Sequence, residues 1–203
     1  MNILIAQPKL EKELIQLEHE LRSHPEADIA IFPEGYLNHN IDLACSLAKR
    51  YGTIIVSGHK RPKDRFVIID RNGEILADRA KYEPSEITTV DDLKIGAMLC
   101  DELVLKGMCG IEPAPLSFIA HPIGVGMFSE EQYEEWIGEA KRIAAAYRTL
   151  VIGTSHADGS FRGSDVSIPI AYCISETGEP LLLSASDTRT RILNLMTRQI
   201  LTV

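Results

Sequence analysis

The stretch KIGAMLCDE, residues 94–102, places a cysteine at the end of a short buried strand. The apolar run Leu93 to Leu99 has the length and composition of a strand inside a sheet. Cys100 follows it, and Asp101 with Glu102 then opens a short helix expected to reach Met108. Backbone N–H groups at such a helix start favour a thiolate and offer donors to an oxyanion. The stretch therefore predicts a strand that presents a nucleophilic thiol.

The other three cysteines lack this context. Cys45 lies within an amphipathic helical pattern, Cys109 lies at a helix end beside Gly110, and Cys173 lies in the middle of a strand. A small, buried core residue is the usual role of such a cysteine, and it remains the alternative for Cys100 as well. Four irregularly spaced cysteines also predict neither a disulfide framework nor a structural zinc site.

The segments around this stretch alternate between helical and strand patterns. Before it, strands are expected at 2–7, 28–32 and 53–57, helices at 10–22 and 41–51, and a hairpin of 65–70 with 74–79 around Asn72-Gly73. After it, strands are expected at 116–121, 151–155, 166–174 and 180–183, with a helix from the N-cap Ser129 to about Arg148. Sheets with two apolar faces must be covered on both, so the pattern predicts an α/β layered sandwich.

Two further reactive side chains follow predicted strands. Glu34 comes directly after the apolar run Ile29 to Phe32 and Pro33, and Lys81 comes at the end of the hairpin. Taken alone, Glu34 is more often a solvated loop carboxylate and Lys81 an ordinary surface cation. In a shared cleft, they would instead act as a general base with a raised pKa and as an ammonium that stabilises an oxyanion.

Together these motifs resemble the nitrilase superfamily of carbon-nitrogen hydrolases. FPEGYL at 32–37 is similar to the family's glutamate motif, RAKYEPSE at 79–86 to its lysine motif, and KIGAMLCDE to its nucleophile motif. The resemblance continues through FIAHP at 118–122, the segment AAAYRTLVIGTSHADG at 144–159, and a closing hairpin formed by residues 160–164 with ETGEP at 176–180. It covers nearly the whole chain, and the order of the motifs makes it specific.

The resemblance implies a four-layer α-β-β-α sandwich and cofactor-free hydrolysis of a small non-peptide amide, carbamoyl compound or nitrile. Glu34 would take the thiol proton, and Cys100 would form a covalent acyl-enzyme. Lys81 and the backbone N–H of Asp101 would hold the oxyanion. Many members have a second glutamate after the lysine, and Glu86 is the preferred candidate here, with Glu83 as the weaker one.

The sequence also departs from the family's pattern. Only 19 positions separate Lys81 from Cys100, which is shorter than usual, and Asp101 replaces the aromatic or small residue usual after the nucleophile. The chain also ends early relative to most members. These features leave open a catalytically idle relative kept for binding or assembly, and an acyltransferase that uses the same thioester. The presence of all three reactive residues favours the hydrolase over the idle relative, whereas the sequence alone does not separate hydrolysis from acyl transfer to an amine.

The composition and charge of the chain limit the classes of partner and cofactor to be expected. The 203 residues suggest one domain spanning 1–203, and the formal charge of −8 without a basic run argues against a nucleic-acid partner. No apolar stretch is long enough for a membrane span, no leader pattern opens the chain, and six scattered histidines show no metal-ligand spacing. We therefore expect a cytoplasmic protein that acts on a small molecule without a metal or other cofactor, and the family resemblance implies a homo-oligomer, a dimer or larger. Trp136 is expected to serve packing or a subunit contact rather than a ligand.

Overall fold

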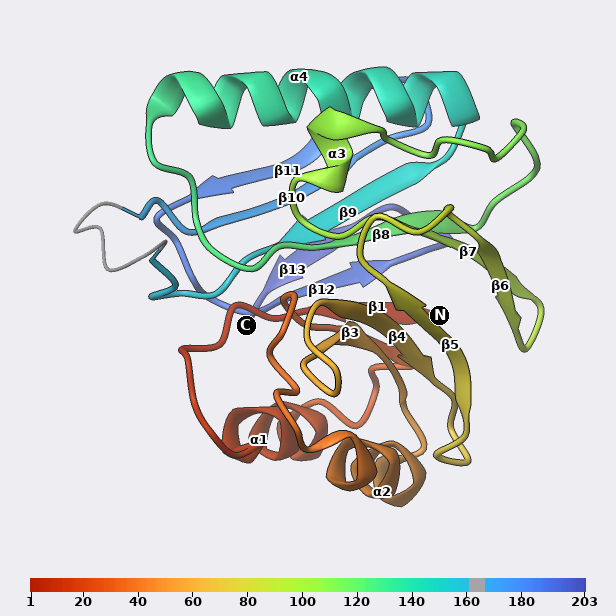
Figure 1. Cartoon of the computed structure of the whole chain (residues 1–203), viewed down its shortest axis with the longest axis vertical. Helices are drawn as coiled ribbons and strands as arrows, with labels where there is room; N and C mark the ends of the chain where they lie inside the picture. Colours follow the sequence, from red (N-terminus) through yellow and green to blue (C-terminus); the bar gives the residue numbers. More distant parts are fainter. Residues whose placement is uncertain (161–166) are drawn as a thin grey trace.

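The computed structural model describes residues 1–160 and 167–203. Within these residues, the strands form two sheets (Figure 1). The first has the order β13-β12-β1-β2-β3-β4-β5 and the second the order β11-β10-β9-β8-β7-β6. We call them sheet A and sheet B. The predicted hairpin segment 160–164 and the start of the strand predicted at 166–174 fall largely on residues 161–166, which lie outside the described part.

Sheet A combines the first three predicted strands, which pair in parallel, and the predicted hairpin with two strands from the end of the chain. Its strands are β1 (Asn2–Ile5), β2 (Ile29–Ile31), β3 (Ile54–His59), β4 (Arg65–Ile69), β5 (Ile75–Ala80), β12 (Arg191–Asn194) and β13 (Ile200–Thr202). Sheet B contains β6 (Ile87–Val90), β7 (Leu93–Ala97), β8 (Phe118–Pro122), β9 (Leu150–Thr154), β10 (Ile170–Ile174) and β11 (Pro180–Ala185).

Helices cover the outer face of each sheet, which confirms the predicted α-β-β-α order (Figure 1). The helices are α1 (Ile15–Ser23), α2 (Ile41–Tyr51), α3 (Glu102–Leu105) and α4 (Glu130–Tyr147). Helices α1 and α2 pack on sheet A, and α3 and α4 pack on sheet B. Buried aliphatic side chains from both sheets fill the space between them. Among the described residues, no helix is both long and apolar enough to cross a membrane.

Two helices are shorter than predicted. The first begins at Ile15 rather than Leu10, because the preceding backbone is engaged elsewhere: Lys9 N–H donates to Gln16 and Leu10 N–H donates to Asp158. Helix α3 ends at Leu105 rather than near Met108. The helix of 41–51 and the Ser129 cap agree with the prediction.

A buried ion pair ties the two sheets together. Arg79 on β5 donates to the two carboxylate oxygens of Glu102 at 2.8 and 2.7 Å. Glu102 also accepts the backbone N–H of Tyr82 at 2.6 Å and of Leu99 at 2.7 Å. Burial alone would raise the pKa of Glu102, but these bonds outweigh it and lower the pKa. The carboxylate therefore joins the segment that follows β5 to the segment that follows β7.

We expect Glu102→Gln to lower the free energy of unfolding by about 3–5 kcal/mol, because it leaves the Arg79 charge buried without a counter-charge. The measurement is denaturant unfolding. Glu139→Gln is the matched control, since its ion pair with Arg142 lies on an exposed part of α4 and should contribute about 0–1 kcal/mol. Equal effects of the two substitutions would contradict a central role for Glu102.

Candidate active site

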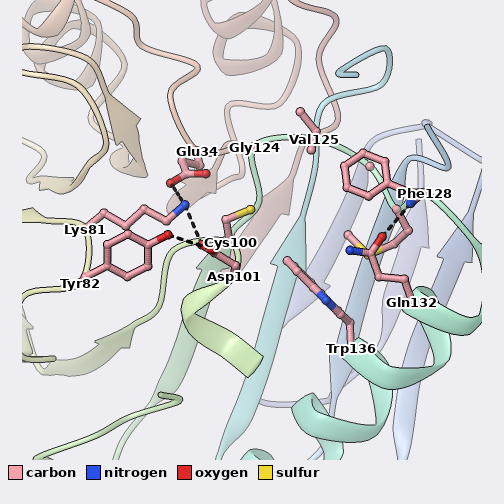
Figure 2. A pocket seen from close by; sticks show the side chains of 12 residues that line it. Glu34, Lys81, Tyr82, Cys100, Asp101, Gly124, Val125, Phe128, Gln132 and Trp136 are labelled. Atoms are coloured by element: carbon pink, nitrogen blue, oxygen red, sulfur yellow. Dashed lines mark hydrogen bonds and ion pairs between the residues drawn. The ribbon is translucent and has the colours of Figure 1, made fainter. Parts of the chain in front are cut away.

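Three predicted site residues meet in one cavity. Glu34 follows β2 and Lys81 follows β5, both in sheet A, while Cys100 follows β7 in sheet B. All three line a cavity of about 330 Å³. Figure 2 shows Lys81 reaching between Glu34 and Asp101, with the sulfur of Cys100 beside them. The site therefore lies where the two sheets face each other.

Lys81 is shared between two carboxylates. Its Nζ lies 3.0 Å from Oε1 of Glu34 and 2.8 Å from Oδ1 of Asp101. The other carboxylate oxygen of Asp101 accepts from the Tyr82 hydroxyl at 2.8 Å. Burial alone would lower the pKa of Lys81, but the neighbouring negative charges outweigh it and raise the pKa well above its ordinary value. Lys81 therefore stays an ammonium at neutral pH.

Glu34 and Cys100 lie beside each other in the cavity as a buried carboxylate and thiol. Cys100 lies close enough to Glu34 for the carboxylate charge to act on the thiol. Burial raises the pKa of Glu34 even though Lys81 opposes it. Burial and then the Glu34 charge raise the pKa of Cys100 to about 12. The thiol is therefore protonated at neutral pH, and its proton faces a carboxylate that can accept it.

Gly124 closes the cavity on the other side of the thiol. Its carbonyl oxygen accepts from Nδ1 of the buried His156 at 2.6 Å. A Cβ at this position would lie 2.8 Å from Oε2 of Glu34. The backbone therefore approaches the carboxylate closely because position 124 has no side chain. The whole Gly124-Val125-Gly126 segment lines the cavity.

The remaining wall of the cavity is largely apolar. It is formed by Val125, Met127, Phe128 and Trp136, together with the amide side chain of Gln132 (Figure 2). Trp136 is buried, as its predicted packing role requires, but it also lines the cavity. The prediction that Trp136 serves packing or a subunit contact is therefore incomplete, because the residue also forms part of the cavity wall.

The candidates for a second glutamate lie elsewhere. Glu86 is exposed and does not belong to the cavity lining, because the chain turns after Lys81 and continues into β6. Glu83 is also exposed, and its carboxylate accepts the N–H of Ala80 at 3.1 Å. The second carboxylate on Lys81 comes instead from Asp101, for which only a role of the backbone N–H was predicted.

Two further residues that hold groups of the candidate site were not predicted from the sequence. Tyr82 supports the Asp101 carboxylate, and Glu102 holds the backbone on both sides of the site. Only their positions in the sequence pointed to them, because Tyr82 directly follows Lys81 and Glu102 directly follows Asp101. In the described part of the chain, no group of three or more His, Cys, Asp or Glu side chains is arranged to hold a metal ion.

No protein-family model matches the sequence, and no curated protein matches it. Solved structures match the fold. The chain is similar to a carbon-nitrogen hydrolase from Helicobacter pylori G27, with a TM-score of 0.74, 11% identity, and coverage of 98% of this chain and 90% of that chain. A cysteine-to-serine mutant of the Nesterenkonia AN1 amidase, from the nitrilase superfamily, matches with a TM-score of 0.80, 13% identity, and coverage of 98% and 92%.

Another structure of the Nesterenkonia sp. AN1 amidase, a glutamate-to-glutamine mutant, shows the acetamide moiety of fluoroacetamide added covalently to that protein's active-site cysteine. It matches with a TM-score of 0.76 and 14% identity, and covers 95% of this chain and 89% of that chain. The chain therefore has the nitrilase-superfamily fold that its motifs predicted.

We expect Gly124→Ala to slow the alkylation of Cys100 by iodoacetamide about tenfold or more, because the new methyl group displaces Glu34 beside the thiol. Intact-mass and peptide mapping give the labelling rate, and the exposed Cys109 is the internal reference. The matched control is Gly138→Ala on α4, where an added Cβ meets no atom within 4 Å. An unchanged rate in Gly124→Ala would contradict the close approach.

Proposed function

We propose that the chain is a carbon-nitrogen hydrolase that cleaves a small non-peptide amide, carbamoyl compound or nitrile through a thioester on Cys100. The observation that carries the proposal is the meeting of Glu34, Lys81 and Cys100 in one cavity, assembled from two sheets. The shared fold with carbon-nitrogen hydrolases and an amidase supports it. An idle binding protein would have no chemical need for a protonated thiol that faces a buried carboxylate.

For an amide, Glu34 accepts the thiol proton as the sulfur of Cys100 attacks the carbonyl carbon. The Lys81 ammonium and the N–H of Asp101 stabilise the resulting oxyanion, with an effect of about 3 kcal/mol per donor. The C–N bond then breaks, Glu34 returns the proton to the leaving nitrogen, and ammonia or an amine departs. The acyl group remains bound to sulfur.

In the hydrolysis of the thioester, Glu34 again acts first as a base and then as an acid. Glu34 takes a proton from water, and the hydroxide equivalent attacks the same carbonyl carbon. The S–C bond breaks, the acid is released, and the thiol is protonated again by Glu34. Every proton transfer passes through one carboxylate, so no further base is required.

The cavity favours a neutral, mainly apolar acyl group. Val125, Met127 and Trp136 supply apolar surface. Among the described residues that line the cavity, Lys81 carries the positive charge and is already paired with Glu34 and Asp101. A substrate carboxylate would therefore meet excess negative charge, whereas a neutral amide would not.

Incubation with a panel of small amides, carbamoyl compounds and nitriles should trap an acyl adduct on Cys100, detected by intact mass and peptide mapping. Neutral amides should be cleaved faster than the same amides carrying a terminal carboxylate. Cys100→Ala should lose the adduct and turnover, while Cys109→Ala, which removes an exposed thiol outside the cavity, should retain both. Release of free acid identifies hydrolysis. Turnover by Cys100→Ala would contradict the proposal.

The pH dependence of amide hydrolysis should report Glu34. Its folded-state pKa is raised, so the active carboxylate is lost as the pH falls through a value above the ordinary one. We expect kcat/KM to fall on this acid side, and Glu34→Gln to lower kcat about 10²-fold or more while the thermal unfolding temperature stays close to that of the wild type. An unchanged acid limb in Glu34→Gln would show that another group is the base.

A further inference from the structure

The backbone at Cys100 is strained and must be held in place. Its φ is 44°, in the left-handed region that residues with a side chain rarely adopt. Such a conformation persists when surrounding contacts fix it. Cys100 N–H donates to the carbonyl of Pro122 at 2.9 Å, and its own carbonyl accepts from Leu103 N–H at 3.2 Å and from Nε2 of His121 at 2.7 Å. Pro122 and His121, at the end of β8, therefore hold the backbone N–H and the carbonyl of Cys100 by hydrogen bonds.

The partners of His121 fix its tautomer. The Cys100 carbonyl can only accept, so Nε2 carries the hydrogen. Nδ1 is then an acceptor, and the hydroxyl of Tyr172 on β10 donates to it. His121 and Tyr172 are both fully buried. Burial lowers the pKa of His121 to about 4, so the ring is neutral at physiological pH.

The Cys100 carbonyl belongs to the same peptide group as the Asp101 N–H. A trans peptide is planar, and its C=O and N–H point in opposite directions. Whatever holds the carbonyl therefore also fixes where the N–H points. His121 holds this carbonyl from the interior, so the N–H is directed away from the ring.

We propose that His121 is a positioning residue, held in one tautomer by Tyr172, that orients the Cys100–Asp101 peptide so that its N–H is available to the oxyanion. The proposal rests on the proposed function, in which the Asp101 N–H stabilises that charge. His121 does not belong to the cavity lining; its ring packs against Trp136, which does, with ring centroids 5.7 Å apart. It acts through the peptide and not on the substrate.

Close packing supports a dedicated role for the Tyr172 contact. A Cβ at Gly153 on β9 would lie 2.4 Å from the Tyr172 ring. The ring therefore occupies space that the absence of a side chain at position 153 provides. This packing keeps the hydroxyl on Nδ1 and so keeps the hydrogen of His121 on Nε2.

The test compares two amide substitutions at position 121. In His121→Gln, the side-chain amide reaches the place of Nε2 and can donate to the Cys100 carbonyl. In His121→Asn, the shorter amide reaches the place of Nδ1 and cannot. We expect kcat for a cleaved amide to fall about 10²-fold in His121→Asn, with KM changed little, and to be largely restored in His121→Gln. Equal kcat values in wild type and His121→Asn would overturn the proposal.

Alkylation by iodoacetamide separates peptide orientation from a general disturbance of the thiol. This reaction displaces iodide and forms no oxyanion, so Cys100 in His121→Asn should be labelled within about twofold of the wild-type rate. Parallel losses of labelling and turnover would overturn the proposal in favour of a purely structural role. Tyr172→Phe, which keeps the ring, should lower kcat in the same direction by a smaller factor.

Nitrogen-15 NMR of the wild-type protein gives a readout that requires no turnover. The proposal predicts that His121 is neutral with its hydrogen on Nε2, and a hydrogen on Nδ1 would overturn it. If the wild-type protein formed no acyl adduct with any compound of the panel, the proposed function would fail while this tautomer measurement still decided the inference. The two failures are therefore distinguishable.

Discussion

The carboxylate of Glu102 is the constraint on which the site depends. Four donors converge on it: two from Arg79 and the backbone N–H groups of Tyr82 and Leu99. One of these backbone groups follows Lys81 and the other precedes Cys100. A buried carboxylate requires several hydrogen-bond donors, because an unpaired buried charge lowers the stability of the folded protein. The same bonds that make the burial tolerable therefore set the spacing between the ammonium and the thiol.

The charges in the cavity determine its resting state. Glu34 and Asp101 supply two carboxylates against the single ammonium of Lys81. This excess of negative charge, together with burial, keeps Cys100 protonated, in contrast to sites where a nearby cation makes a cysteine a standing thiolate. Reactivity is therefore coupled to proton transfer within the cavity. It does not arise from a thiol that is permanently ionised.

Local sequence patterns predicted much of this structure, whereas several contacts between distant parts of the chain were not predicted. Strand β7, which ends at Ala97 rather than at Leu99 as predicted, and the helix ending before Gly52 follow from short apolar patterns and turn residues. Strands β6, β12 and β13 were not predicted, and the place of β12 is set by pairing with β1 at the opposite end of the chain. The Asp101 carboxylate and Glu102 were missed for the same reason, since their roles depend on partners brought from the β5 segment. The single-domain organisation, the homo-oligomer and the cytoplasmic location stay predictions.

The division of the candidate site between two sheets would make the proposed reaction depend on the packing of one sheet against the other. Sheet A alone carries a carboxylate and an ammonium, and sheet B alone carries a thiol. Neither half can make or hydrolyse a thioester, however well its own hydrogen bonds have formed. In the proposed reaction, the site would therefore be complete only once the two sheets have packed against each other.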